Sequence, residues 1–318
     1  MRYTLHNADC STWLRSCPQN SIHGVVTDPP YGLIEFSEKE RDTLRNGQRG
    51  GIWRMPPKLN GIERDPLPRF TVLTENEKNN LREYMRDWGI ALLPALRPGG
   101  HVYVAGNPML QYLIQAAMAD AGYEVRTTVM RLYVGLRGGD RPKLAEQEFP
   151  EVSVTPRGGY EPWMLFRKPI SEKTVAANLR KWGTGGLRRL AREKPFPDVI
   201  QSGRTPEIES QLSIHPTMKP QHLLRILVRS VLPLGEGVVL DTFAGSGSTL
   251  AAAEAIGYES VGIELDQHYY AEALETIPLL AKIYPGFVGD TLELPSTYLP
   301  AIDRPRKQMR SSPQGSLI

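Results

Sequence analysis

Residues Asp28-Pro29-Pro30-Tyr31 combine hydrogen-bond acceptors with an aromatic ring, directly after a buried strand. The carboxylate of Asp28 and the carbonyl of Pro29 can each accept a hydrogen bond from one proton of an exocyclic amine. Tyr31 offers a ring on which a flat base can stack. The two prolines fix the backbone, so little ordering remains for binding. The tetrapeptide suits a site that holds an aromatic amine, although a plain turn is compatible with the same residues.

A second group of residues forms a glycine turn between a strand and a helix. The apolar stretch 238–240 leads into Asp241-Thr242-Phe243-Ala244-Gly245-Ser246-Gly247. Glycines let the backbone approach a ligand closely. Glu264 ends the next predicted strand, nineteen positions after Gly245, where a carboxylate can accept hydrogen bonds from ribose hydroxyls. This pattern favours a nucleoside-containing cofactor over an ordinary strand-to-helix turn.

Two other nucleotide sites fit this turn poorly. The nicotinamide fingerprint requires a third glycine at the position of Leu250, so a pyrophosphate site is disfavoured. A P-loop is excluded because no Lys-Ser or Lys-Thr pair follows the glycines.

Alternating helices and strands position these motifs and predict an α/β fold. Strands are predicted over 3–5, 24–27, 101–105, 124–134, 163–167, 238–240 and 260–263, with the fourth and fifth pairing as a hairpin. Helices are predicted over 12–15, 75–96, 108–121, 220–231, 249–256 and from 267 onward. Residues 34–74 lack periodicity, and we expect a long mobile loop there.

The chain divides into four predicted regions. Residues 1–134 and 215–285 carry the two motifs, 135–214 interrupt the alternation with Gly, Pro and Arg, and 286–318 form a basic, Pro-rich tail. Within 173–194, seven basic residues stand against one acidic residue. Such clustering favours a polyanion surface, although a solvated face is the alternative.

Composition excludes several classes of protein. The 318 residues are 40% hydrophobic and 23% charged, with a net charge of only +3, as in an ordinary folded domain. Cys10 and Cys17 are too few for a disulfide framework, and the six histidines suggest no metal set. No apolar run approaches the about 20 residues that span a bilayer, so we expect a cytoplasmic protein without membrane contact.

Together the motifs resemble those of the S-adenosylmethionine-dependent DNA amino-methyltransferases. Residues 28–31 match the catalytic motif of that family and 243–247 match its cofactor motif. The order, with the catalytic motif first and a variable region between, is similar to the beta group. The segment 215–220, His-Pro-Thr-Met-Lys-Pro, matches a stretch that encloses the methionine end of the cofactor in the family. The resemblance covers about 1–33, 85–134 and 213–275.

The resemblance implies a Rossmann-like methyltransferase fold, a mostly parallel sheet with an antiparallel hairpin and an inserted target-recognition region over 135–214. It implies a catalytic set of Asp28, Pro29, Pro30 and Tyr31, and no metal. It also implies a set of residues that line S-adenosylmethionine: Asp9, Asp28, Lys219, Asp241, Phe243, Ala244, Gly245, Gly247 and Glu264. The sequence departs from the family at Ala8, where Gly is usual, and at Thr242, where Pro is common; we expect the second change to be tolerated.

The implied reaction is direct attack of the amine nitrogen on the methyl group of the sulfonium, with the target nucleotide flipped out of double-stranded DNA. Asp at position 28 favours adenine N6, whereas Ser there would favour cytosine N4. Phosphates would be contacted by the basic set Arg180, Lys181, Arg188, Arg189 and Arg192. The loop over 34–74 would either close over DNA or remain a tether.

Other readings stay open. An RNA methyltransferase would share both motifs, a protein glutamine methyltransferase usually has Asn in place of Asp28, and a non-catalytic DNA-binding module would not use the cofactor. Carbon-5 cytosine methylation is disfavoured because neither cysteine stands in a nucleophile context. A homodimer and a separate restriction or defence subunit are further expectations.

Overall fold

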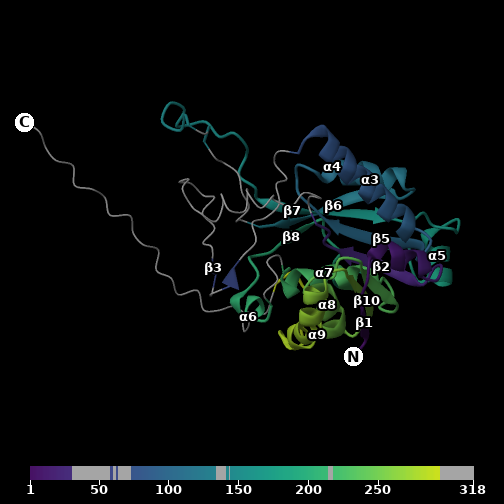
Figure 1. Cartoon of the computed structure of the whole chain (residues 1–318). Coiled ribbons are helices and arrows are strands. Elements are labelled where there is room, and N and C mark those ends of the chain that lie inside the picture. Colours follow the sequence, from purple (N-terminus) through teal and green to yellow (C-terminus); the bar gives the residue numbers. More distant parts are fainter. Residues whose placement is uncertain are drawn as a thin grey trace, which may run out of the picture.

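The computed structural model describes residues 1–30, 58–59, 62–63, 73–133, 141–142, 144–213 and 218–293. Within these residues, eight strands form one mixed sheet in the order β1-β10-β9-β2-β5-β7-β6-β8 (Figure 1). Neighbouring strands are parallel except around β7, which is antiparallel to both β5 and β6. The predicted mostly parallel sheet with one antiparallel hairpin is therefore confirmed.

The strands of this sheet are β1 (Tyr3–Asn7), β2 (Ile22–Thr27), β5 (Leu96–Ala105), β6 (Glu124–Leu132), β7 (Tyr160–Arg167), β8 (Val199–Gln201), β9 (Val238–Asp241) and β10 (Glu259–Glu264). A separate antiparallel pair consists of β3 (Lys58–Leu59) and β4 (Ile62–Glu63). These four residues, with 73 and 74, are the described part of the expected loop over 34–74; the rest of that expectation lies outside the described residues.

The helices are α1 (Cys10–Ser16), α3 (Glu75–Leu92), α4 (Gln111–Asp120), α5 (Val175–Trp182), α6 (Glu207–Ser210), α7 (Gln221–Val231), α8 (Ser248–Ile256) and α9 (Gln267–Lys282). Figure 1 shows α3 and α4 on one face of the sheet and α7, α8 and α9 on the other. The parallel strands that alternate with these helices are buried from both sides, as their continuous apolar runs require.

Helix α3 illustrates how the sequence pattern becomes packing. Its buried residues Leu81, Met85, Trp88 and Leu92 recur every three or four positions and join the hydrophobic core between α3 and the sheet. Thr74 and Glu77 form a capping box at its first turn, in which each side chain accepts a hydrogen bond from the other residue's backbone N–H. The predicted start at residue 75 is thus explained, although the helix stops at Leu92 rather than residue 96.

Strand β5 begins five residues earlier than predicted. The Gly99 N–H donates to the Lys168 carbonyl, and the Lys168 N–H donates to the Gly100 carbonyl, both at 2.9 Å. This pairing extends the antiparallel contact with the chain after β7. Gly99 and Gly100, which follow the predicted helix over 75–96, therefore lie within a strand.

The order of strands brings the two motifs together. Strand β9 pairs with β2 and with β10, and β10 pairs with β1. These four strands are parallel, so they end at the same edge of the sheet, which we call the carboxyl edge. Their first residues define the opposite, amino edge. Asp28 follows β2 at the carboxyl edge, where Asp241 and Glu264 end their strands.

The segment predicted as a target-recognition region contributes to the sheet as well. Strand β7 lies inside the sheet, and the short strand β8 pairs with the end of β6 as the outermost strand. The division of the chain into functional regions stays a prediction.

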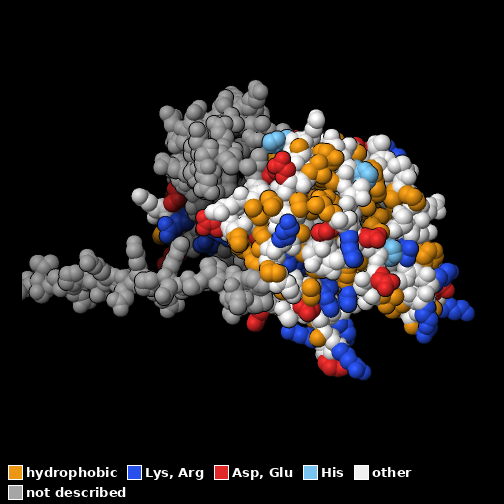
Figure 2. Space-filling model, turned by 90° about the horizontal axis from the view of Figure 1, so that it is seen from below, with side chains coloured by type: hydrophobic (Ala, Val, Ile, Leu, Met, Phe, Trp, Pro, Cys, Tyr) orange, Lys and Arg blue, Asp and Glu red, His pale blue; other side chains and the backbone are white. Residues whose placement is uncertain are grey.

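The face formed by α7, α8 and α9 carries apolar side chains scattered among charged ones, as Figure 2 shows from below. Leu274 and Leu279 of α9 are two such side chains, each more than two-fifths exposed. Among the described residues, no helix is both long and apolar enough to cross a membrane.

Candidate active site

Asp28 lies just past β2 and contacts a lysine from a distant part of the chain. Its Oδ2 accepts a hydrogen bond from the Lys219 ammonium group. Its Oδ1 is buried and has no hydrogen-bond partner among the described residues, although 20% of the side chain is exposed. Pro29 is buried and Pro30 is exposed. One oxygen of this carboxylate is therefore fixed, and the other is available as an acceptor.

Lys219 also contacts a second carboxylate, which the sequence analysis did not identify. Oε1 of Glu161, on β7, lies 3.3 Å from the Lys219 ammonium nitrogen. Oε2 of Glu161 accepts hydrogen bonds from Nη1 of Arg131 at 2.9 Å and from Nε1 of Trp163 at 3.2 Å. Asp28, Lys219, Glu161 and Arg131 thus form a chain of alternating charges.

The protonation of Lys219 reflects these two partners. Burial lowers the pKa of the Lys219 ammonium, but the carboxylates of Asp28 and Glu161 act more strongly together and raise that pKa above its ordinary value. Lys219 is therefore the charged partner of both carboxylates at neutral pH.

The backbone around Lys219 is held on both sides. Oε2 of Glu209 accepts from the Gln221 N–H at 2.8 Å, at the start of α7. The Gln221 side chain donates to the Ser248 carbonyl at 2.9 Å, at the start of α8. The hydroxyl of Thr205 donates to the Met218 carbonyl at 2.7 Å. These contacts connect the lysine to the glycine turn.

Asp241 is buried at the start of that turn. Its Oδ1 accepts from the Thr27 hydroxyl at 2.7 Å and from the Phe243 N–H at 3.1 Å. Burial raises the pKa of Asp241 to about 6, and these hydrogen bonds oppose that shift. Asp241 thus links the end of β2 to the glycine turn.

Glu264 lies beside the turn from the neighbouring strand. Its Oε2 accepts from the Gly245 N–H at 2.7 Å, and its Oε1 accepts from the Asp266 N–H at 2.8 Å. Burial raises the pKa of Glu264. Each carboxylate oxygen has a further lone pair, so Glu264 retains acceptor capacity for hydroxyl groups. Ala244 is buried, and its N–H donates to the Ile263 carbonyl at 2.9 Å.

Asp9 lies at the same edge and begins α1. The backbone N–H of Ala8 donates to the Glu264 carbonyl at 3.0 Å, so the two chain segments are adjacent. Oδ1 of Asp9 accepts from the backbone N–H and the hydroxyl of Thr12, at 2.8 and 2.9 Å. The backbone hydrogen bond is the main reason that the pKa of Asp9 is lowered. This helix cap is a structural role for Asp9, whatever else it contacts.

Phe243 and Thr242 pack toward α3. The ring of Phe243 lies 6.1 Å from that of Trp88 and 6.5 Å from that of Tyr84, between centroids. The Thr242 hydroxyl accepts from Nε1 of Trp88 at 3.2 Å. Thr242, where proline is common in the family, therefore satisfies a buried indole N–H.

Gly247 has a packing role in the turn. Its φ is +78°, and a Cβ there would lie 2.3 Å from Cγ1 of Ile277 on α9. The absence of a side chain lets α8 begin against α9.

The basic residues predicted to bind DNA are not brought to Asp28. The guanidinium of Arg188 donates to the Tyr258 hydroxyl, and the backbone N–H of Arg188 donates to the Ser230 carbonyl at 2.8 Å. Both contacts lie near the starts of β9 and β10. Helix α5, which carries Arg180 and Lys181, is fixed to the start of β5 because Asn178 donates to the Pro98 carbonyl at 2.8 Å. Figure 1 shows α5 on the far side of the molecule from α6. The amino edge of the sheet thus carries Arg180, Lys181 and Arg188. Arg189 follows Arg188 in the chain, and the side chain of Arg192 is 97% exposed.

Several predicted features fall outside the described residues: Tyr31, residues 214–217, which include His215 of the third motif, and residues 294–318 of the predicted tail. Within the described residues, no group of three or more His, Cys, Asp and Glu side chains could hold a metal ion.

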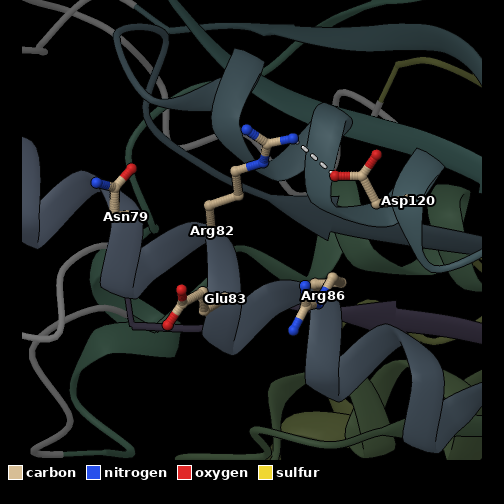
Figure 3. Close-up of a pocket in the computed structure, with 5 residues that line it drawn as sticks. All are labelled: Asn79, Arg82, Glu83, Arg86 and Asp120. Carbon is tan, nitrogen blue, oxygen red and sulfur yellow. Dashed lines mark hydrogen bonds and ion pairs between the residues drawn. The ribbon is translucent and has the colours of Figure 1, made fainter.

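A separate hollow lies on the outer side of α3. Asn79, Arg82, Glu83 and Arg86 line it from one helix, and Asp120 lines it from the end of α4 (Figure 3). Arg82 and Asp120 form an ion pair at 2.7 Å with both side chains about half exposed. Trp88, by contrast, faces inward from α3 to Thr242, so this hollow is not part of the site around Asp28.

Relatives with similar sequences include Type II methyltransferases. The Type II methyltransferase M.HindIII of Haemophilus influenzae is 22% identical over 293 residues, which span 86% of this chain and 94% of the relative. The sequence model of the DNA methylase family with N6 and N4 specificity matches residues 22–275.

Solved structures share the fold. A protein of Thermus thermophilus, TTHA0409, proposed to be a DNA modification methylase and complexed with S-adenosyl-L-methionine, has a TM-score of 0.55 at 19% identity and covers 90% of this chain and 96% of its own. The PvuII DNA methyltransferase, which is cytosine-N4-specific, has a TM-score of 0.56 at 15% identity, with 92% and 90% covered. The family match spans most of the chain, so the chain belongs to the N6/N4 DNA methylase family, which confirms the resemblance to the S-adenosylmethionine-dependent DNA amino-methyltransferases.

Proposed function

We propose that the protein transfers a methyl group from S-adenosylmethionine to the exocyclic N6 amine of adenine in double-stranded DNA. The observation that carries this proposal is the state of Asp28. Lys219 fixes one oxygen of its carboxylate, and the other is buried without a partner among the described residues, at the edge where the glycine turn begins. A buried acceptor without a donor is costly unless a ligand supplies one. An exocyclic amine is such a donor.

The residues at the carboxyl edge suit the cofactor. Glu264 would accept hydrogen bonds from its ribose, Phe243 would contact its adenine ring, and Asp9, Asp241, Ala244, Gly245 and Gly247 would complete the walls and turn of its site. Bound S-adenosylmethionine would supply a methyl group on a sulfonium. The amine nitrogen would bond to this methyl carbon as the carbon–sulfur bond breaks, which leaves S-adenosylhomocysteine as a neutral thioether. The complex of TTHA0409 with this compound supports the assignment.

Asp28 would orient the amine. Its free Oδ1 accepts one amine proton, and the carbonyl of Pro29 accepts the other. An aromatic amine delocalises its lone pair into the ring, and two fixed acceptors favour the geometry in which the lone pair is available for attack. Asp28 is also placed to receive the proton that the methylated nitrogen loses. Lys219 would hold Asp28 in position, and its contact with the methionine end of the cofactor, which the motif suggests, stays a prediction.

The target nucleotide would leave the duplex to reach Asp28. Tyr31 is proposed to stack on the flipped base, which stays a prediction because Tyr31 lies outside the described residues. Asp rather than Ser at position 28 favours adenine over cytosine. The cytosine-N4-specific PvuII enzyme shares the fold, so N4 methylation is the alternative that the experiment must separate.

DNA would approach the carboxyl edge, since Asp28 lies there. Contact of DNA phosphates with the basic set Arg180, Lys181, Arg188, Arg189 and Arg192 stays a separate prediction, because Arg180, Lys181 and Arg188 lie at the opposite, amino edge. A homodimer and a separate restriction or defence subunit stay predictions.

The test is transfer of labelled methyl from S-adenosylmethionine to unmethylated bacterial genomic DNA, followed by digestion to nucleosides and mass spectrometry. N6-methyladenine is the expected product. N4-methylcytosine would overturn the base assignment and keep the reaction. Label in RNA or protein, with none in DNA, would contradict the proposed substrate.

A further inference from the structure

Glu161 stands at the centre of the buried charges around the proposed catalytic carboxylate. Both of its oxygens are engaged: Oε1 with Lys219 at 3.3 Å, and Oε2 with Arg131 at 2.9 Å and with Trp163 at 3.2 Å. Its side chain is only 10% exposed. Such a carboxylate is held in one orientation by its three donors.

The four charges balance one another. Asp28 and Glu161 are the anions, and Lys219 and Arg131 are the cations. Lys219 lies between the two anions and within electrostatic reach of Arg131, which acts against its charge. Without Glu161, Lys219 and Arg131 would both lose a carboxylate partner, and removing one member of a buried ion pair is costly.

The network also reaches the segment after β8. Nη2 of Arg131 donates to the Gly203 carbonyl at 2.7 Å, and its guanidinium lies 4.8 Å from the centre of the Tyr133 ring. Arg131 and Glu161 are directly opposite each other in the β6–β7 ladder. Backbone pairing therefore sets the place of Glu161 independently of Lys219.

We propose that Glu161 is a positioning residue for methyl transfer, which fixes the Lys219 ammonium group and, through it, the orientation of the Asp28 carboxylate. This inference rests on the proposed function, because Asp28 must be the group that holds the amine. Glu161 itself contacts neither substrate nor cofactor in this account.

The first test compares Glu161→Gln with Glu161→Asp in single-turnover methyl transfer. Gln keeps the shape of the side chain and removes its charge, whereas Asp keeps the charge and withdraws it by one methylene. We expect the rate of E161Q to fall about 100-fold, as small misplacements of reacting groups do. E161D should recover part of the rate, and the affinities for S-adenosylhomocysteine and DNA should stay within about twofold in both variants.

Glu124→Gln provides the matched control. Glu124 pairs with Arg167 across the same two strands, at 2.6 Å, but at their other end. This variant removes a carboxylate from a β6–β7 ion pair and should leave the transfer rate unchanged. An equal loss of rate in E124Q and E161Q would show that any weakening of the ladder is enough, and would overturn the proposal.

The second readout is independent of activity. The pKa of Lys219, measured by NMR of side-chain-labelled lysine, should fall in E161Q, because one of two nearby carboxylates is lost. A wild-type rate together with an unchanged Lys219 pKa in E161Q would overturn the inference. If wild-type protein methylates no DNA and the Lys219 pKa still falls, the proposed function fails while the link between Glu161 and Lys219 stands. If E161Q does not fold, E161D answers the question, since a rate equal to that of wild type would then contradict a positioning role.

Discussion

The ammonium group of Lys219 donates a hydrogen bond to Asp28, although 191 positions separate the two residues in the chain. The contact joins the end of β2 to the segment that begins α7. It leaves one oxygen of Asp28 without a partner among the described residues, next to the turn that follows β9. The site thus depends on strand order, which brings the two halves of the chain to one edge.

Glu264→Ala should weaken cofactor binding. The variant removes the acceptor proposed for the ribose and the partner of the Gly245 N–H. Hydrogen bonds to a charged group contribute about 1.5–3 kcal/mol, so the dissociation constant for S-adenosylhomocysteine should rise about 10- to 100-fold, measured by calorimetry.

Asp266→Asn is the control for that variant. Asp266 caps α9 two positions further on, by accepting from the His268 N–H at 2.7 Å, and Asn caps helices equally well. Its affinity should match that of wild type. Unchanged affinity in the Glu264→Ala variant would remove Glu264 from the cofactor site.

Gly247→Ala should destabilise the fold through a clash as well as backbone strain. An added Cβ would lie 2.3 Å from Ile277 at a φ of +78°. Strain at positive φ costs about 1–2 kcal/mol and overpacking about 1–3 kcal/mol more in the free energy of unfolding, measured in urea.

Gly183→Ala separates the two contributions. Gly183 has a φ of +74°, with nothing within 4 Å of an added Cβ. This variant should show the strain alone. Equal losses at both positions would mean that α8 and α9 adjust freely around the new methyl group.

The helices and strands around the site were largely predictable, because Asp28, Asp241 and Glu264 each follow or end an apolar run. Glu161 was not identified, since it lies before residue 163, where the sequence predicts that its strand begins; β7 in fact begins at Tyr160. Its signal was the opposite charge of Arg131 on the strand predicted to pair with it, but recognising that signal requires the register. The DNA-binding role of the basic set stays a prediction. Its place at the amino edge could not be predicted, because charge density along the chain does not say at which edge of a sheet a segment packs.

The stability of the protein should depend on pH through Asp241. Burial raises its pKa from 3.8 to about 6, so the folded state binds this proton more tightly than the unfolded state does. The contribution of this bound proton to the free energy of unfolding is complete below about pH 4 and is lost as the pH rises through about 6. Asp241→Asn lacks this titration, so wild type should lose about 2 kcal/mol of unfolding free energy relative to the variant between about pH 4 and about pH 6.5. A pH-independent difference, measured by urea unfolding at each pH, would contradict the buried, titrating state of Asp241.

In the proposed reaction Asp28 holds the amine that receives the methyl group, and Asp28→Asn removes the charge of this acceptor. Asn keeps the size of the side chain but replaces a charged acceptor by a neutral amide. Single-turnover transfer of labelled methyl to DNA should fall at least about 100-fold, while the affinity for S-adenosylhomocysteine stays within about twofold and Glu124→Gln behaves as wild type. Transfer at the wild-type rate, or a loss explained wholly by weaker cofactor binding, would show that Asp28 does not hold the amine.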